Sequence, residues 1–233
     1  MDVYSIKGNK LNTVELNSFQ KERDIQDLVE KNTDTLFDVD FVSSEFKIGE
    51  FRIDTLCFDN ESNSFVIIEY KKGSSYSVID QGYSYLSKML NNKDSFILEY
   101  CRKKKVSVDI KVDWSQSRVI FVSPSFNSYQ KNSVNFKDMN KFELWEIKRF
   151  DNNTIVLNQY QSKSNESIEN VVGNNDSIIN KVNKEIKVYK EEDHTSKVST
   201  KLLEKWVDFK NLLNELGGVE LAPKRHYISL KFE

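Results

Sequence analysis

Two charged residues follow directly on an apolar stretch, where charge is costly unless it is paired or used. The run "FVIIEYKKG" begins with four apolar residues and then carries Glu69 and Lys71. Side chains alternate along a β-strand, so Glu69 and Lys71 project to one face. The earlier run "FRIDTLCFD" carries Asp54, on the face of Leu56, and a hairpin pairing of the two runs would place Asp54 beside Glu69. The pattern predicts two carboxylates and one ammonium group in close proximity.

This set of groups fits the hydrolysis of a phosphodiester bond. Two carboxylates can bind a hard divalent cation together with a backbone carbonyl and water molecules. A neighbouring lysine can orient or deprotonate the attacking water, while the metal stabilises the charge that grows on the phosphate. The alternative is a structural ion-pair network at the end of two strands, which is an ordinary feature of proteins.

A helix ahead of these strands carries a further candidate. Ser18 is suited to be its N-cap, Ile25 and Val29 recur at helical spacing, and Asn32 ends the pattern. Glu22 lies on the Ile25 and Val29 face, so we expect it to turn towards the core, where a carboxylate needs a partner.

The remaining elements indicate an α/β fold with a mixed β-sheet flanked by helices. The hairpin strands span residues 51–59 and 64–71 on either side of a polar turn. Further strands are predicted over 40–48, 117–126, 142–150 and 154–160, and further helices over 74–90 and 94–105.

The composition changes towards the C-terminus. We expect one domain over residues 1–160, a Ser- and Asn-rich linker over 161–194, and a small C-terminal α+β unit over 195–233. The last unit combines an amphipathic helix with an alternating strand. So few elements bury little surface, so the unit either packs on the first domain or is cut short at Glu233.

Asp54 followed by Glu69-Tyr70-Lys71 resembles the PD-(D/E)XK motif of the restriction-endonuclease-like nuclease superfamily, with Ile53 at the position of the proline, a common departure. The runs "RIDTLCFD", "FVIIEYKKG" and "DQGYSYL" also resemble a group of uncharacterised prokaryotic proteins, similar in layout to the NucS-type endonucleases of archaea and actinobacteria. The resemblance covers residues 18–126.

The resemblance implies a restriction-endonuclease-like fold and a Mg²⁺-dependent endonuclease, with Mn²⁺ as an alternative cofactor. The implied partner is nucleic acid, with DNA expected, and a homodimer follows by family analogy. Gln81 matches by order and spacing a glutamine on the helix after the lysine strand, and Glu22 a glutamate on the preceding helix. The implied catalytic residues are Asp54, Glu69, Lys71, Glu22 and Gln81, and the implied metal ligands are Asp54, Glu69 and the carbonyl of Tyr70.

Composition narrows the function classes further. The 233 residues carry a formal net charge of -2, so nucleic-acid binding would need a local basic patch. No apolar run approaches the roughly 20 residues that span a bilayer, and the N-terminal residues "MDVYSIKGNK" lack the basic-then-apolar pattern of a signal peptide. We therefore expect a cytoplasmic protein without membrane association. Two cysteines and two histidines indicate neither a disulfide framework nor a zinc finger.

Other residues admit two interpretations. Glu45 ranks below the acids named above as a member of the cluster. The basic run at 102–105 either contacts phosphates or forms a solvated helix end, and we favour the latter. Tyr76, Tyr83 and Tyr85 either stack on bases or pack in the core, and we favour the core. At the level of the whole protein, the alternatives to an enzyme are a non-catalytic nucleic-acid or protein interaction module that retains a nuclease fold, and a purely structural partner protein.

Overall fold

The computed structural model describes residues 2–72, 77–135, 141–160 and 178–232. The chain divides into two units, Met1–Ile186 and Lys187–Glu233. Among the described residues, no helix has the length and apolar character needed to cross a membrane.

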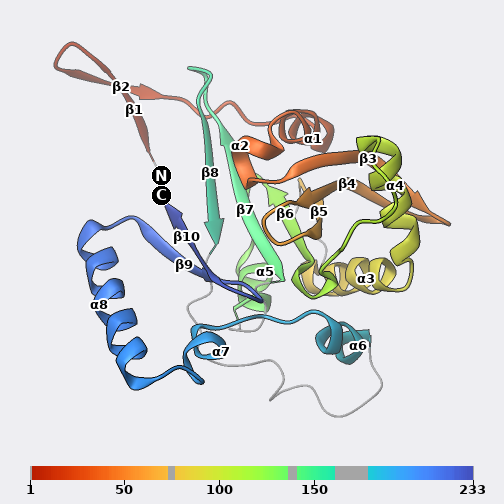
Figure 1. The fold of residues 1–233 in the computed structure, drawn as a ribbon. Coiled ribbons are helices and arrows are strands. Elements are labelled where there is room, and N and C mark those ends of the chain that lie inside the picture. Colours follow the sequence, from red (N-terminus) through yellow and green to blue (C-terminus); the bar gives the residue numbers. More distant parts are fainter. Residues whose placement is uncertain (1, 73–76, 136–140, 161–177, 233) are drawn as a thin grey trace. The chain divides into compact units, whose positions relative to one another are not determined.

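A six-stranded mixed sheet forms the centre of the first unit (Figure 1). The strands β3, β4 and β5 pair antiparallel, β5, β6 and β7 pair parallel, and β8 pairs antiparallel with β7. The predicted fold class, a mixed sheet flanked by helices, is confirmed. The strands are β3 (Asp40–Ile48), β4 (Phe51–Asp59), β5 (Ser64–Tyr70), β6 (Arg118–Ser123), β7 (Phe142–Arg149) and β8 (Ile155–Tyr160).

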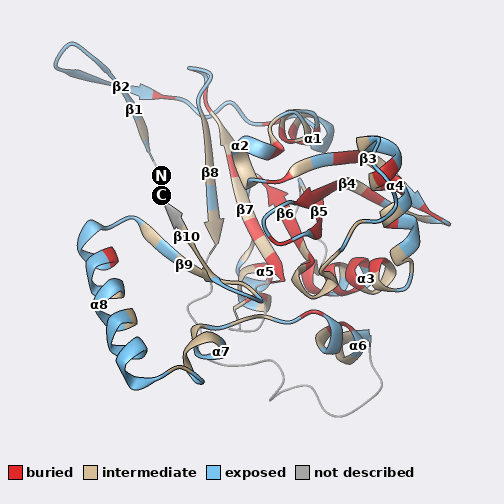
Figure 2. Cartoon of the chain, in the orientation of Figure 1, coloured by how far each residue is buried: buried red, intermediate tan, exposed pale blue. Residues whose placement is uncertain are grey.

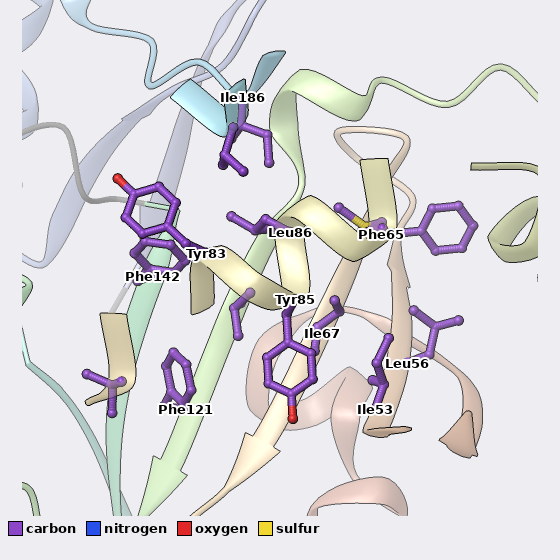
Figure 3. Packing of buried hydrophobic residues seen from close by; sticks show 14 of the residues in the cluster. Ile53, Leu56, Phe65, Ile67, Tyr83, Tyr85, Leu86, Phe121, Phe142 and Ile186 are labelled. Atoms are coloured by element: carbon purple, nitrogen blue, oxygen red, sulfur yellow. The ribbon is translucent and has the colours of Figure 1, made fainter. Parts of the chain in front are cut away.

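Helices cover both faces of this sheet. On one face, an apolar cluster joins Ile67 of β5 to Leu86 of the helix over residues 78–90 (Figure 3). The same cluster contains Phe96 of the following helix. A second cluster joins Val66 to Ile25 on the opposite face. Both faces of β5 are therefore covered, and all seven of its residues are buried (Figure 2). The helices of the first unit are α1 (Glu22–Glu30), α2 (Thr33–Phe37), α3 (Val78–Leu90), α4 (Lys93–Lys104), α5 (Ser128–Ser133) and α6 (Ile178–Glu185), with a 3-10 turn at Trp114–Gln116.

Two features of the first unit differ from the sequence-based expectation. Helix α1 begins at Glu22 and not near Ser18, because the carboxylate of Asp24 accepts the Lys21 N–H bond at 3.0 Å and caps the helix there. The N-terminal residues form a separate hairpin of β1 (Val3–Lys7) and β2 (Lys10–Val14), which was not predicted.

The expected linker at 161–194 contains ordered structure. Residues 161–177 lie outside the described residues, but α6 belongs to the first unit. Val182 and Ile186, four residues apart on one face, are buried in the cluster that contains Leu86. This burial places the end of the first unit after residue 186.

The second unit contains α7 (Glu191–Thr195), α8 (Thr200–Leu216) and a hairpin of β9 (Val219–Pro223) and β10 (Ile228–Phe232). The helix and the last strand match the sequence-based expectation, while β9 adds a partner strand. Within the unit, the carboxylate of Glu191 accepts hydrogen bonds from Trp206 Nε1 at 2.7 Å and Lys210 Nζ at 2.8 Å.

Close packing of α3 on β7 leads to a first prediction. A Cβ atom added at Gly82 would lie 2.5 Å from Cε1 of Phe142, too close for a side chain at this position. We expect Gly82→Ala to lower the free energy of unfolding by about 1–3 kcal/mol, because the overpacking outweighs the higher helix propensity of alanine. Urea unfolding measures this change. The control is Ser84→Ala on the exposed side of α3, and equal stability of the two variants would contradict the prediction.

Candidate active site at the ends of β4 and β5

Asp54 and Glu69 lie side by side where two strands of the sheet end their pairing. The β4–β5 register runs from Asp59↔Ser64 to Thr55↔Ile68, and one more step places Asp54 opposite Glu69. The Asp54 N–H donates to Glu69 Oε1 at 3.1 Å, and the Tyr70 N–H donates to Asp54 Oδ2 at 3.3 Å. The structure thus brings together the two carboxylates that the hairpin pattern predicted.

Lys71 and Gln81 both reach the same oxygen of Glu69. Lys71 Nζ is 3.5 Å from Glu69 Oε2, and Gln81 Nε2 donates to it at 3.3 Å. Lys71 follows the last residue of β5, and its N–H still donates to Val122 of β6 at 2.9 Å. The strand geometry therefore continues to Lys71 and keeps it on the side of Glu69.

Tyr85 completes the surroundings of Glu69 and was not predicted to do so. Its hydroxyl hydrogen-bonds the Glu69 carboxylate and accepts a bond from Gln81 Nε2 at 3.1 Å. The signal lay in the sequence, since Gln81 and Tyr85 are four residues apart on one helix face. The preference for the core over base stacking is correct in that Tyr83 and Tyr85 are buried, whereas Tyr76 lies outside the described residues.

The two carboxyl groups are held at an electrostatic cost. Burial, and next the charge of Asp54, raise the pKa of Glu69 to about 7. Burial also raises the pKa of Asp54. Lys71 lowers both pKa values without offsetting these effects. The pair therefore carries negative charge that the protein itself compensates only in part.

The donor set fits a hard divalent cation. It consists of two carboxylates and the main-chain carbonyl of Tyr70 at the strand end, all oxygen donors of the kind preferred by Mg²⁺ and Mn²⁺. Among the described residues, no group of three or more His, Cys, Asp or Glu side chains is arranged to hold a metal ion. A metal at this place would accordingly take its remaining ligands from the main chain and water.

Glu22 is close to the site, but not in the expected way. It is exposed at the first turn of α1, so the expectation that it faces the core is wrong. Its Oε1 accepts the Lys72 N–H bond at 2.7 Å and so ties α1 to the residue after Lys71. Ile25 and Val29 are buried against the sheet, but Glu22 is the first residue of the helix, one turn before them. Its carboxylate is therefore in solvent.

Glu45 and Gln26 form a second polar group behind Asp54. Glu45 has a positive φ of 54° within β3, and its carboxylate pairs with Arg52 at 2.9 Å and with Arg23 at 3.5 Å. Gln26 is buried on α1, and its Nε2 donates to the Asp54 carbonyl at 3.1 Å. Sequence reasoning did not single out Gln26.

Two residues of the basic run at the end of α4 form ion pairs. Arg102 contacts Glu99 at 2.7 Å, and Lys104 contacts Asp40 at 3.1 Å. These pairs favour the structural interpretation of the run over phosphate binding.

Comparisons with other proteins give one strong match. A Haemophilus influenzae protein, described as uncharacterized, is 45% identical over 234 residues, which cover 99% of this chain and 77% of that protein. No family model matches the chain.

Solved structures give weaker matches. EndoMS in complex with double-stranded DNA aligns with a TM-score of 0.33 at 18% identity, and a repair endonuclease from Pyrococcus abyssi with 0.32 at 19%. Each alignment covers 57% of this chain and about half of the other, 47% and 49%. SfsA of Pyrococcus furiosus in complex with Ca²⁺ aligns with a TM-score of 0.30 at 9% identity, over 63% of this chain and 74% of the other. Alignments at these scores do not bear on what the chain does.

Proposed function

The chain belongs to the same family as the Haemophilus influenzae protein, and we propose that it is a metal-dependent nuclease that hydrolyses phosphodiester bonds, with DNA as its substrate. One observation carries the proposal: Asp54, Lys71 and Gln81 all converge on the buried carboxylate of Glu69. A structural ion-pair network would gain nothing from two adjacent carboxylates whose pKa values burial raises.

Each residue has a role in this proposal. Asp54, Glu69 and the Tyr70 carbonyl would hold Mg²⁺ or Mn²⁺, which supplies a water molecule of lowered pKa and neutralises charge on the phosphate when bound. Lys71 orients the attacking water and donates to the developing negative charge. Gln81 holds Glu69 Oε2 at 3.3 Å, which leaves the carboxylate a single orientation.

The substrate class rests on the motif resemblance, which also motivates DNA as the first nucleic acid to test. Assembly as a homodimer and a cytoplasmic location belong to the same proposal, because they come from the superfamily resemblance and from the sequence. Glu22 enters as a residue that supports the chain after Lys71 through the Lys72 N–H.

A cleavage assay with Asp54→Asn tests the proposal. Single-stranded, duplex and branched DNA and RNA are incubated with Mg²⁺, Mn²⁺ or EDTA. We expect cleavage that requires a metal, and a loss of at least about 100-fold in kcat/KM for Asp54→Asn, since the metal contributes several kcal/mol of transition-state stabilisation. Asp94→Asn, at an exposed position in the first turn of α4, serves as the control. Metal-dependent cleavage that is equal in both variants would remove Asp54 from the mechanism.

The second candidate is a non-catalytic module that binds nucleic acid or protein. One observation favours it: among the described residues, the site has two carboxylates and no group of three or more side chains that could hold a metal ion. Nucleic-acid binding by the wild type without cleavage in any metal, unchanged in Asp54→Asn, would support this candidate over the enzyme.

A further inference from the structure

Asp54 is not among the paired residues of β4 on either side of the strand. On the β3 side, the paired residues include Thr55 and Ile53 but skip Asp54. On the β5 side, the pairs run from Asp59 back to Thr55, so Asp54 lies one residue beyond the last pair. The neighbouring strand is irregular at the same level, since Glu45 has its φ at 54°. The main chain of Asp54 consequently needs partners other than the ladder.

Side chains supply those partners. Glu69 Oε1 accepts the Asp54 N–H bond at 3.1 Å, and Gln26 Nε2 donates to the Asp54 carbonyl at 3.1 Å. Two side chains therefore hold the Asp54 main chain: Glu69 at the N–H and Gln26 of α1 at the carbonyl. The direction of the Asp54 carboxylate follows from the position of this main chain.

Gln26 is itself firmly held. It is 5% exposed, and its Nε2 also donates to Glu30 Oε1 at 2.9 Å, with longer contacts to Ser44 Oγ at 3.3 Å and Glu45 Oε1 at 3.4 Å. A long amide in a buried site with several acceptors has little rotational freedom.

The network behind Gln26 continues to the strand that carries Glu69. Thr55 Oγ1 donates to Glu30 Oε1 at 2.7 Å and lies 3.0 Å from the hydroxyl oxygen of Tyr70. Tyr70 directly follows Glu69, and its N–H donates to Asp54. The buried chain of hydrogen bonds from α1 therefore reaches both strand ends, next to the two carboxylates.

We infer that Gln26 is a positioning residue of the candidate site, which fixes the Asp54 main chain and thereby the separation of the Asp54 and Glu69 carboxylates. The fixed separation gives the Asp54 and Glu69 carboxylates a higher affinity for a divalent cation. The inference rests on the proposed function, because it concerns the same pair of ligands. The Gln26 amide contacts the main chain of Asp54 and acts through it, in the way that outer residues orient metal ligands.

The test measures Mn²⁺ binding by titration calorimetry, without any substrate, for wild type and Gln26→Leu. We expect the dissociation constant to rise about 10- to 100-fold in the variant, the range typical of residues that orient ligands. Gln26→Met keeps about the length of the side chain and adds no charge, but it cannot donate to the Asp54 carbonyl. It should therefore lose affinity too, and it serves if Gln26→Leu does not fold.

The matched control is Gln130→Leu. Gln130 is 2% exposed and caps α5 through its bond from the Asn127 N–H at 3.0 Å, so the substitution removes a similarly buried amide from a helix that carries none of the proposed site residues. We expect it to lower the stability against urea without changing Mn²⁺ affinity. If the wild type bound Mn²⁺ and both Gln26 variants bound it with the same affinity, the inference would be overturned but the proposed function would stand. The same holds if Gln130→Leu changed the affinity as much as the Gln26 variants do. Absence of Mn²⁺ binding by the wild type would overturn the proposed function and the inference together.

Discussion

Glu69→Gln is expected to abolish the proposed metal-dependent cleavage and, at the same time, to stabilise the metal-free protein at pH 8. In the folded wild type, burial and the charge of Asp54 raise the pKa of the Glu69 carboxyl to about 7, above its ordinary value of 4.5. Between these pH values the folded state keeps a proton that the unfolded state has released, so stability falls as the pH rises from 4.5 to 7. Above pH 7 the full cost is present, and glutamine, which carries no charge, avoids it.

The size of this gain follows from the pKa values. A shift of this extent corresponds to at most about 3 kcal/mol, and the gain should vanish near pH 4, where the wild-type carboxyl is protonated in both states. Urea unfolding in EDTA at pH 4 and pH 8 measures it, beside a cleavage assay with Mg²⁺. Glutamine can still accept the Asp54 N–H bond, and the Gln81 amide can rotate to accept from the new one, so the fold is retained.

Glu99→Gln provides a control of opposite sign. Glu99 is also buried, which by itself raises its pKa, but hydrogen bonds from Ser43 and Arg102 leave the pKa below its ordinary value. The charged form is therefore favoured in the folded state, and we expect this variant to be less stable than wild type at pH 8. A Glu69→Gln protein that loses stability at pH 8 as Glu99→Gln does would show that the charge of Glu69 is compensated within the protein.

The hairpin and its carboxylates could be predicted because the information is local. Strand parity and the β4–β5 register place Glu69 and Lys71 on one side and Asp54 next to them. The parity argument for Asp54 is nevertheless incomplete. Ile53 and Leu56, an odd number of positions apart, pack in the same apolar cluster, so the alternation is interrupted between them (Figure 3).

The errors and omissions come from tertiary structure. Glu22 shares a helix face with Ile25, but whether that face still meets the sheet depends on where the helix begins, which the Asp24 cap decides. Gln26 and Tyr85 are ordinary residues of amphipathic helices by sequence. Their roles depend on which backbone carbonyl or carboxylate lies across from them. The place of α6 in the first unit depends on tertiary structure in the same way, since its short apolar pattern becomes a core contact only next to α3.

Lys71→Met is expected to reduce kcat of the proposed cleavage by about 10²- to 10⁴-fold, the usual contribution of a group that moves or orients a proton. Mn²⁺ affinity should not fall with it. Lys71 Nζ is 3.5 Å from Glu69 Oε2, and removing a positive charge from beside this proposed metal ligand favours the binding of a cation. Calorimetric titration with Mn²⁺ and single-turnover cleavage, measured on the same protein, separate the two quantities.

Lys72→Met is the control for this experiment, because the neighbouring ammonium group bonds the Gln20 carbonyl instead of a carboxylate of the site. We expect its cleavage rate to stay within a few-fold of wild type. If Lys71→Met lost Mn²⁺ binding in step with activity, Lys71 would act by holding Glu69 in place. If both lysine variants cleaved at the wild-type rate, a group other than Lys71 would have to orient the attacking water. The acid-x-lysine pattern at the end of β5 would then describe a metal site without its expected proton-transfer partner.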